Sequence, residues 1–295
     1  YFRILPMEQN LGFAGGYNEA LRQTDAEIYC LLNSDVRVTP GWIDPIFPLF
    51  ANDPQLAAIQ PKILSDRDPS RFEHAGAAGG FIDRYGYPFC RGRIMNEIES
   101  DLGQYNRSTP IFWASGACMF IRAALFHQAG GFDARYFAHM EEIDLCWRLK
   151  NQGYRLMYEP SITVYHWGGA TLEYNNPRKL YLNFRNSLWT LYKNYTGKRF
   201  CLILFRRTII DTFALVKYVL SLDLKNAKAV LVAHLDYYQS RPILRKMREE
   251  EMKKTTGLEH PEMLKGSIVW SFFIKRKKTF TELRSFRSFD QDHSR

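Results

Sequence analysis

The most informative stretch of the sequence lies in the middle of the chain, where residues 136–148 read Tyr-Phe-Ala-His-Met-Glu-Glu-Ile-Asp-Leu-Cys-Trp-Arg. Three carboxylates fall within four positions, Glu141, Glu142 and Asp144, and Arg148 follows Asp144 at the spacing of one helical turn. Acidic residues at the start of a helix complement its dipole, which explains such a cluster without any catalytic role. Carboxylates are equally the groups that serve in general acid–base catalysis, so the stretch is either an ordinary helix start or a catalytic centre.

A second acidic site stands upstream, after a strand-like apolar run over residues 26–32. Residues 33–35, Asn-Ser-Asp, follow this run, and the ligands of open α/β sheets bind at the carboxyl ends of the strands. Such oxygen ligands suit a divalent cation, whereas the alternative is an Asx-type turn at the strand exit. Downstream of the first stretch, a strand-like run over residues 155–159 returns the chain to His166, which precedes Trp and two glycines.

The rest of the body alternates strand-like and helix-like runs, which is typical of an α/β fold. A glycine-rich loop over residues 10–18 permits close backbone approach before a helix from Glu19, and its N–H groups could hold phosphate. The loop matches neither the dinucleotide-binding nor the phosphate-loop pattern, and a simple turn is the alternative. We expect further strands over residues 2–5, 56–62 and 111–122, and helices from Pro40, over residues 123–128 and from Pro177.

Between residues 65 and 109, glycines interrupt short aromatic pieces. Long irregular segments in compact domains are usually functional covers or disorder. We interpret this one as a cover over the site, with a hairpin as one option. Trp113 follows it, and aromatic faces suit the C–H surface of sugars, although the protein core is the more frequent place for a Trp.

The charge of the chain is uneven. The net charge is +9, yet residues 1–197 carry 19 basic and 20 acidic side chains, whereas residues 198–295 carry 21 and 11. A basic C-terminal region suggests an anionic partner, which is a membrane surface, a nucleic acid or an anionic substrate carrier, and a solvated basic surface is the alternative. The five cysteines are scattered without a C-x-x-C pair, so we expect neither a zinc site nor disulfides, which fits a reducing compartment.

The C-terminal region is also predicted to be helical. Residues 200–222 are strongly apolar but contain four charged side chains, too many for a helix that spans a membrane. An amphipathic helix that lies on a membrane, or packs on the body, fits better. Helix is expected to continue over residues 225–238, and aromatic residues precede a basic cluster at residues 275–278, as in an interfacial anchor. No recognised nucleic-acid module is present, so we expect no nucleic-acid partner.

Several motifs together resemble the inverting family 2 glycosyltransferases with the GT-A fold, in their rhamnosyltransferase-like branch. Each motif is weak alone, but the ordered combination is specific. The resemblance covers residues 1–195, and residues 196–295 would form a basic, amphipathic helical appendage. The motifs are N-x-G-F-A-G-G-x-N from Asn10, L-L-N-S-D up to Asp35, S-G-A-C from Ser115, G-G-F-D from Gly130, E-E-I-D-L-C-W-R from Glu141 and H-W-G-G from His166.

The resemblance implies a metal-dependent transfer from a nucleotide sugar. Asp35 and His166 would hold Mn²⁺ or Mg²⁺, which neutralises the diphosphate as it leaves. Glu142 stands at the position of the catalytic base and would take the proton of the acceptor hydroxyl, with Asp144 and Arg148 positioning acceptor or base. The donor site would comprise Gly12, Gly15, Gly16, Asn18, Asn33 and Arg148.

Two departures from the family pattern stand out. The base position usually holds Asp, and the extra methylene of Glu142 moves the carboxylate by about 1.5 Å. A displacement of about 1 Å can cost about 10²-fold in rate, so either the site compensates or Glu141 or Asp144 takes the role. The family also begins with a strand–helix–strand segment that contacts the nucleotide base. That segment is absent here, so we expect a mixed, Rossmann-like sheet that lacks its first strands.

The resulting hypothesis is a glycosyltransferase that uses a dTDP- or UDP-sugar, with rhamnose suggested by the branch. The acceptor would be a lipid-linked or polysaccharide hydroxyl in cell-surface glycan synthesis. The protein would act in the cytoplasm as a peripheral protein at the inner face of the cell membrane, held there by its basic helices. The alternative is a truncated, inactive relic that acts as a binding or scaffold module. A nucleotidyltransferase would need Arg and Lys after a glycine-rich loop, and residues 10–18 contain neither.

Overall fold

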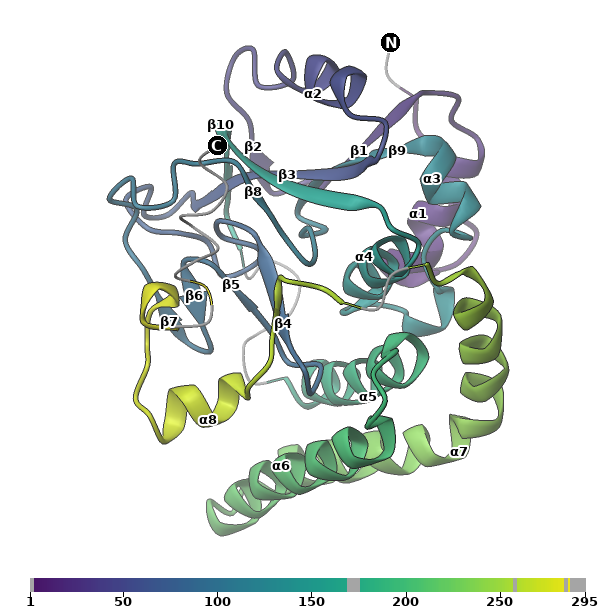
Figure 1. The fold of residues 1–295 in the computed structure, drawn as a ribbon, viewed down its shortest axis with the longest axis vertical. Coiled ribbons are helices and arrows are strands. Elements are labelled where there is room, and N and C mark those ends of the chain that lie inside the picture. Colours follow the sequence, from purple (N-terminus) through teal and green to yellow (C-terminus); the bar gives the residue numbers. More distant parts are fainter. Residues whose placement is uncertain (1–2, 169–175, 257–258, 284–285, 287–295) are drawn as a thin grey trace.

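The centre of the computed structural model, which describes residues 3–168, 176–256, 259–283 and 286, is a mixed sheet with helices on both faces (Figure 1). From edge to edge its strands are β1 (Ile28–Leu32), β9 (Cys118–Arg122), β3 (Leu56–Ser65), β10 (Arg155–His166) and β2 (Val36–Arg37), with β8 (Thr109–Pro110) also paired to β10. β3 and β10 run parallel, and the other neighbours are antiparallel. The predicted α/β class with a mixed sheet is therefore confirmed. β1 forms one edge, and the absence of the family's first strands stays a prediction.

The helices of the body divide between the two faces of the sheet. Ile46 and Phe50 of α2 pack on one face in a small apolar core. The other helices lie on the opposite face, over a larger core that contains Leu21, Phe126 and Leu188 (Figure 1). The elements are α1 (Gly12–Arg22), α2 (Ile46–Asn52), α3 (Ala123–Gln128), the 3-10 helix η1 (Ala134–Tyr136), α4 (Glu141–Asn151) and α5 (Pro177–Asn194).

Two local predictions near the start of the chain were wrong. The described part of the expected strand, residues 3–5, has no regular structure, and Ile4 is 73% exposed, so no core or neighbouring strand stabilises this apolar run. The expected glycine-rich loop is largely the start of α1, which begins at Gly12 rather than near residue 19. Gly12 has a φ of 70°, and a Cβ there would lie 2.4 Å from the Phe137 carbonyl oxygen. Glycine therefore lets α1 begin directly against that segment.

The segment that we expected to be irregular forms most of a second sheet. Its strands are short, which leaves too little periodicity for recognition from sequence. Gly80 is needed where this sheet meets Trp113, because a Cβ there would lie 2.2 Å from the indole. Trp113 is buried and donates its Nε1–H to the Phe81 carbonyl at 2.8 Å, so it belongs to the core. In order, the strands are β11 (Met263–Leu264), β4 (Gly80–Asp83), β5 (Pro88–Cys90), β6 (Arg93–Ile94) and β7 (Glu97–Ile98).

The C-terminal region is helical, as predicted, and packs on the body. α7 (Leu224–Lys254) packs along α5 and forms a hairpin with α6 (Phe200–Leu220). On the buried side of α6, Arg207 pairs with Asp211 at 2.9 Å and donates to the Tyr85 carbonyl and the Ser187 hydroxyl. α8 (Ile268–Phe273) and the 3-10 helix η2 (Phe280–Glu282) complete the region, and the domain boundary at residue 195 stays a prediction. Within the described residues, no helix combines the length and apolarity needed to cross a membrane. All five cysteines are free.

Candidate active site

The pairing of β2 with β10 brings together the two residues that we expect to hold a metal ion. The Trp167 N–H donates to the Asp35 carbonyl oxygen at 3.0 Å, which continues this pairing by one residue. His166 Nε2 consequently lies 3.1 Å from Asp35 Oδ1, although the residues are 131 positions apart. The turn before β2 is fixed through its backbone, since the Asn33 N–H donates to the Ala117 carbonyl at 3.0 Å.

Glu73 is a third member of this group that the sequence analysis missed. Its Oε1 lies 3.6 Å from His166 Nδ1, which is beyond hydrogen-bond distance, and this buried Nδ1 has no hydrogen-bond partner. Burial would lower the pKa of His166, but the carboxylates of Glu73 and Asp35 raise it above its usual value. Glu73 lies in the segment between β3 and β4, where no motif pointed to it.

These side chains fit an open cation site rather than a closed one. A carboxylate and an imidazole are both ligands that Mn²⁺ accepts. Cations that bind substrate phosphates are commonly held by only one or two protein groups, with the phosphates as further ligands. In the part of the chain that the structure describes, no three His, Cys, Asp or Glu side chains gather closely enough to hold a metal ion by themselves. Asp35 and His166 would therefore hold a cation only together with a phosphate-bearing ligand.

The backbone that leads into the acidic helix start is strained. Phe137, His139 and Met140 have φ angles of 65°, 69° and 74°, in the left-handed region that bulky residues rarely adopt. Glu141 and Glu142 follow directly as the first residues of α4. Strain of this kind persists only where surrounding contacts impose it, and it concentrates at functional sites.

Asn186 on α5 provides those contacts. Its buried Nδ2 lies within hydrogen-bond distance of three carbonyl oxygens, those of Tyr136 at 3.1 Å, Ala138 at 2.9 Å and His139 at 2.7 Å. The neighbouring Arg185 guanidinium also donates to the Tyr136 carbonyl, at 3.2 Å. The sequence signal that could have pointed to these contacts is a polar Arg-Asn pair beside the apolar face of a helix.

The two glutamates at the start of α4 have buried carboxyl oxygens. The Oε2 atom of each is buried without a hydrogen-bond partner. Burial raises the pKa of Glu142 to about 7, although backbone N–H groups at the helix start lower it. Burial, and secondarily the charge of Glu142, raise the pKa of Glu141 well above its usual value. A carboxyl with a pKa near 7 is suited to exchange a proton at neutral pH, so the environment of Glu142 fits a general base.

The first turn of α5 links the two parts of the site. Burial lowers the pKa of His74, the neighbour of Glu73, to about 2, and the charges of Arg93 and Lys179 lower it further. Burial likewise lowers the pKa of His139 to about 4, again assisted by Lys179. Lys179, in the first turn of α5, therefore lowers the pKa of one histidine in each part of the site.

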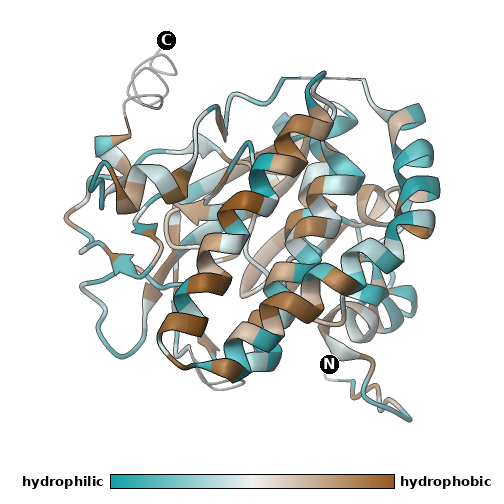
Figure 2. Cartoon of the chain, turned by 90° about the horizontal axis from the view of Figure 1, so that it is seen from below, coloured by the Kyte–Doolittle hydropathy of each residue, from teal (hydrophilic) through white to brown (hydrophobic). Residues whose placement is uncertain are grey.

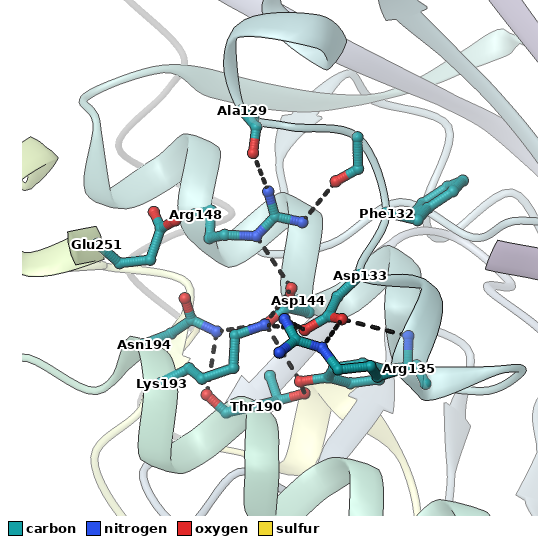
Figure 3. A network of polar contacts seen from close by, with 12 residues as sticks. Ala129, Phe132, Asp133, Arg135, Asp144, Arg148, Thr190, Lys193, Asn194 and Glu251 are labelled. Carbon is teal, nitrogen blue, oxygen red and sulfur yellow. Dashed lines mark hydrogen bonds and ion pairs between the residues drawn. The ribbon is translucent and has the colours of Figure 1, made fainter. Parts of the chain in front are cut away.

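Asp144 and Arg148 lie in a buried polar network (Figure 3). Asp144 accepts from Arg148 Nε at 2.9 Å and Asn194 Nδ2 at 2.8 Å, and pairs with Lys193 Nζ at 3.0 Å. Burial would raise the pKa of Asp144, but Lys193 and Arg148 lower it to about 2. Arg148 also donates to the Gly131 carbonyl at 2.7 Å. The structure thus gives both residues the role of attaching α4 to α5 and to the loop after α3. The predicted roles of Asp144 and Arg148 in positioning acceptor or base, and of Arg148 in the donor site, stay predictions.

The predicted donor-site residues of α1 mostly contact protein. The Asn18 side chain accepts from the Phe132 N–H at 2.9 Å and donates to the Phe132 carbonyl at 2.7 Å, which fixes the loop after α3. A Cβ on Gly12 or Gly15 would meet protein atoms at 2.4 and 2.9 Å, whereas one on Gly16 would meet nothing within 4 Å. Contacts of these residues with a donor nucleotide stay predictions, and Gly16 has the most room for one.

Comparison with known proteins identifies the family to which the chain is similar. Residues 3–186 match the family described as "Glycosyltransferase like family 2". N-acetylglucosaminyl-diphospho-decaprenol L-rhamnosyltransferase of Mycobacterium tuberculosis is 31% identical over 187 residues, which cover 56% of this chain and 58% of that protein. Rhamnosyltransferase WbbL of Escherichia coli is 41% identical over 59 residues, 20% of this chain and 22% of WbbL. The chain therefore spans little more than half of the length of the mycobacterial relative and less than a quarter of the length of WbbL.

A solved structure shows only a distant likeness. The crystal structure of GalNAc-T7 with UDP, GalNAc and Mn²⁺ aligns with a TM-score of 0.49 and 13% identity, over 65% of this chain and 37% of that one. At these values the likeness adds nothing to the family match.

Proposed function

The chain belongs to the family 2 glycosyltransferases, and from this premise we propose that it transfers a sugar from a nucleotide sugar to an acceptor hydroxyl, with inversion. The observation that carries the proposal is the approach of Asp35 and His166 to 3.1 Å, in a chain that also places the buried Glu141 and the partly buried Glu142 at a strained helix start. The first pair would bind the donor diphosphate through a cation, and the glutamates would meet the acceptor.

In this reaction the chain's own residues hold the reactants and move one proton. Asp35 and His166 would hold Mn²⁺ or Mg²⁺, which when bound offsets the charge of the departing diphosphate. Glu142 would take the proton of the acceptor hydroxyl as its oxygen bonds to the anomeric carbon. The bond between that carbon and the diphosphate oxygen breaks, and the nucleoside diphosphate leaves with the electron pair.

Among the three carboxylates, Glu142 is the best base. Burial and the charge of Glu142 raise the pKa of Glu141 well above its usual value, which favours the protonated form, and a protonated carboxyl donates a hydrogen bond rather than accepting a proton. Asp144, with a pKa of about 2 and its oxygens occupied by Arg148, Lys193 and Asn194, is too weakly basic. Glu142, with a pKa of about 7, lies between these extremes.

We further propose a dTDP- or UDP-sugar as the donor and a lipid-linked or polysaccharide acceptor. The name of the mycobacterial relative supports rhamnose as the sugar and a polyprenyl diphosphate as the carrier of the acceptor. We also propose that the protein acts in the cytoplasm at the inner face of the cell membrane, where its basic C-terminal helices would hold it.

Donor hydrolysis tests the proposal with the chain as it exists. We would compare a panel of dTDP- and UDP-sugars with and without Mn²⁺, for the wild type, Asp35→Ala and Glu142→Gln, with the exposed Glu249→Gln as control. We expect metal-dependent turnover that both site variants lose and the control retains. Turnover that is independent of metal and equal in all four proteins, or no turnover and no metal-dependent thermal shift with any nucleotide, would overturn the proposal.

A further inference from the structure

The hairpin of α6 and α7 has an unusual distribution of side chains. The buried side of α6 carries charge, since Arg207 and Asp211 are each only 1% exposed. Ile203 is buried beside them, but other apolar side chains of α6 are exposed with spacings of three and four residues, which places them on one stripe of the helix. The exposed stripe consists of Leu202, Phe205, Ile209, Phe213, Val216 and Leu220.

The stripe continues across the turn and onto α7. Leu222, in the turn between the helices, is 83% exposed. Leu224, Leu231, Leu235 and Tyr238 are exposed along the first half of α7, again at helical spacing. Figure 2 views the molecule from this side and shows hydrophobic segments along both helices. We call these residues and the stripe of α6 the α6–α7 face.

The exposed charges that border this face are basic, whereas Asp223 and Asp236 are partly buried and accept hydrogen bonds from Asn226 and Tyr181. Asp211 is the single acidic residue of α6 and is buried, so the exposed charged side chains of this helix are Arg206 and Lys217. Both lie next to the apolar stripe, one residue after Phe205 and after Val216. Lys198 and Arg199 precede α6, and Lys225 and Lys228 lie in the first turns of α7. All four are exposed.

We propose that the α6–α7 face docks onto a lipid bilayer that contains anionic phospholipids. A helix of 21 residues is about 30 Å long, and one that exposes apolar side chains between basic ones lies along a membrane surface with its apolar stripe in the acyl boundary. Basic residues at the border of the face match anionic headgroups. A second copy of the chain is a poorer occupant, because pairing two such faces would bring like charges together. Docking does not require catalysis, whereas delivery of the site to a lipid-linked acceptor rests on the proposed function.

Vesicle flotation tests the docking without any enzyme assay. The full chain is mixed with vesicles of phosphatidylglycerol and phosphatidylcholine, or of phosphatidylcholine alone, at low and high salt. We expect flotation with the anionic vesicles that weakens at high salt. Phe205→Gln together with Phe213→Gln should lower the partition coefficient by at least about tenfold, because each ring leaves water on docking. Arg206→Gln with Lys217→Gln should lower it by about fivefold per residue on anionic vesicles only.

A matched control uses exposed apolar residues elsewhere on the molecule. Phe47→Gln with Leu102→Gln removes two large exposed side chains, which are 60% and 86% exposed, outside the α6–α7 face. This variant should float like the wild type, and unchanged thermal unfolding of all variants confirms that they are folded. The proposal would be overturned if the wild type did not float with anionic vesicles, or if the control variant lost as much flotation as Phe205→Gln with Phe213→Gln. So would a dimer in sedimentation experiments that Phe205→Gln with Phe213→Gln dissociates, since the face would then bind a second copy.

Discussion

Replacement of Asp144 by Asn should lower the stability of the whole domain, because the carboxylate neutralises two buried cations. Asp144 is fully buried, and both Arg148 and Lys193 pair with it at 2.9 to 3.0 Å. Its pKa falls from 3.8 to about 2 on folding, which corresponds to about 2–3 kcal/mol of stability at neutral pH. The loss should exceed this value, since the variant leaves the buried Arg148 without its carboxylate and leaves Lys193 paired only with Asp133, and breaking a buried pair typically costs about 3–5 kcal/mol. We therefore expect Asp144→Asn to lower the free energy of unfolding by about 3–5 kcal/mol.

Urea unfolding at pH 7, followed by tryptophan fluorescence, measures this difference. The control is Glu249→Gln, which breaks a pair at the same i,i+4 spacing with Arg245, but on the exposed side of α7. It should cost less than about 0.5 kcal/mol, because solvent screens exposed pairs.

The pH dependence follows from the sign of the shift. Since folding lowers the pKa, the stabilisation is present above pH 3.8 and is lost as pH falls towards 2. The difference between wild type and variant should stay constant from pH 7 to pH 5 and shrink below about pH 4. An Asp144→Asn protein within about 1 kcal/mol of the wild type that has nevertheless lost donor turnover would refute the positioning role and favour a direct one.

Three further predictions address the site and its frame. Glu142→Gln should reduce turnover by about 10²–10⁴-fold. Wild-type kcat/KM should rise with pH, reach half of its maximum near pH 7 and level off above about pH 8, because the base acts only when deprotonated. A flat profile would exclude this carboxyl as the base. Gly12→Ala should lower the free energy of unfolding by about 1–3 kcal/mol, because φ is 70° and the new Cβ would lie 2.4 Å from a carbonyl oxygen. Gly16→Ala should be neutral or stabilising, because a Cβ there meets open space. Thermal melts that rank the two variants in the opposite order would contradict this prediction. Asn186→Ala should lower the free energy of unfolding by about 1–3 kcal/mol and also lower turnover, since the Ala138 and His139 carbonyls lose their side-chain donor. A loss of stability in chemical unfolding with unaffected turnover would show that the strained segment does not serve catalysis.

The sequence alone determined the class of fold, the family and the positions of the candidate acids. Long buried runs such as β3, and helices with a periodic apolar face such as α5, were predictable because their pattern is local. The short strands of the second sheet and the start of α1 at Gly12 were not. Those depend on contacts with Trp113 and Phe137, which lie far away along the chain.

The pKa values and hydrogen-bond partners of the predicted residues depend on the tertiary structure. Glu142 and Asp144 are two positions apart and equally acidic in the sequence, yet burial raises the pKa of one to about 7, while Lys193 and Arg148 lower that of the other to about 2. Glu73 and Asn186 gained roles through partners that no local pattern announces. The physical reason is that electrostatic and hydrogen-bond energies depend on distances in space, which only the packing of β10, α4 and α5 fixes.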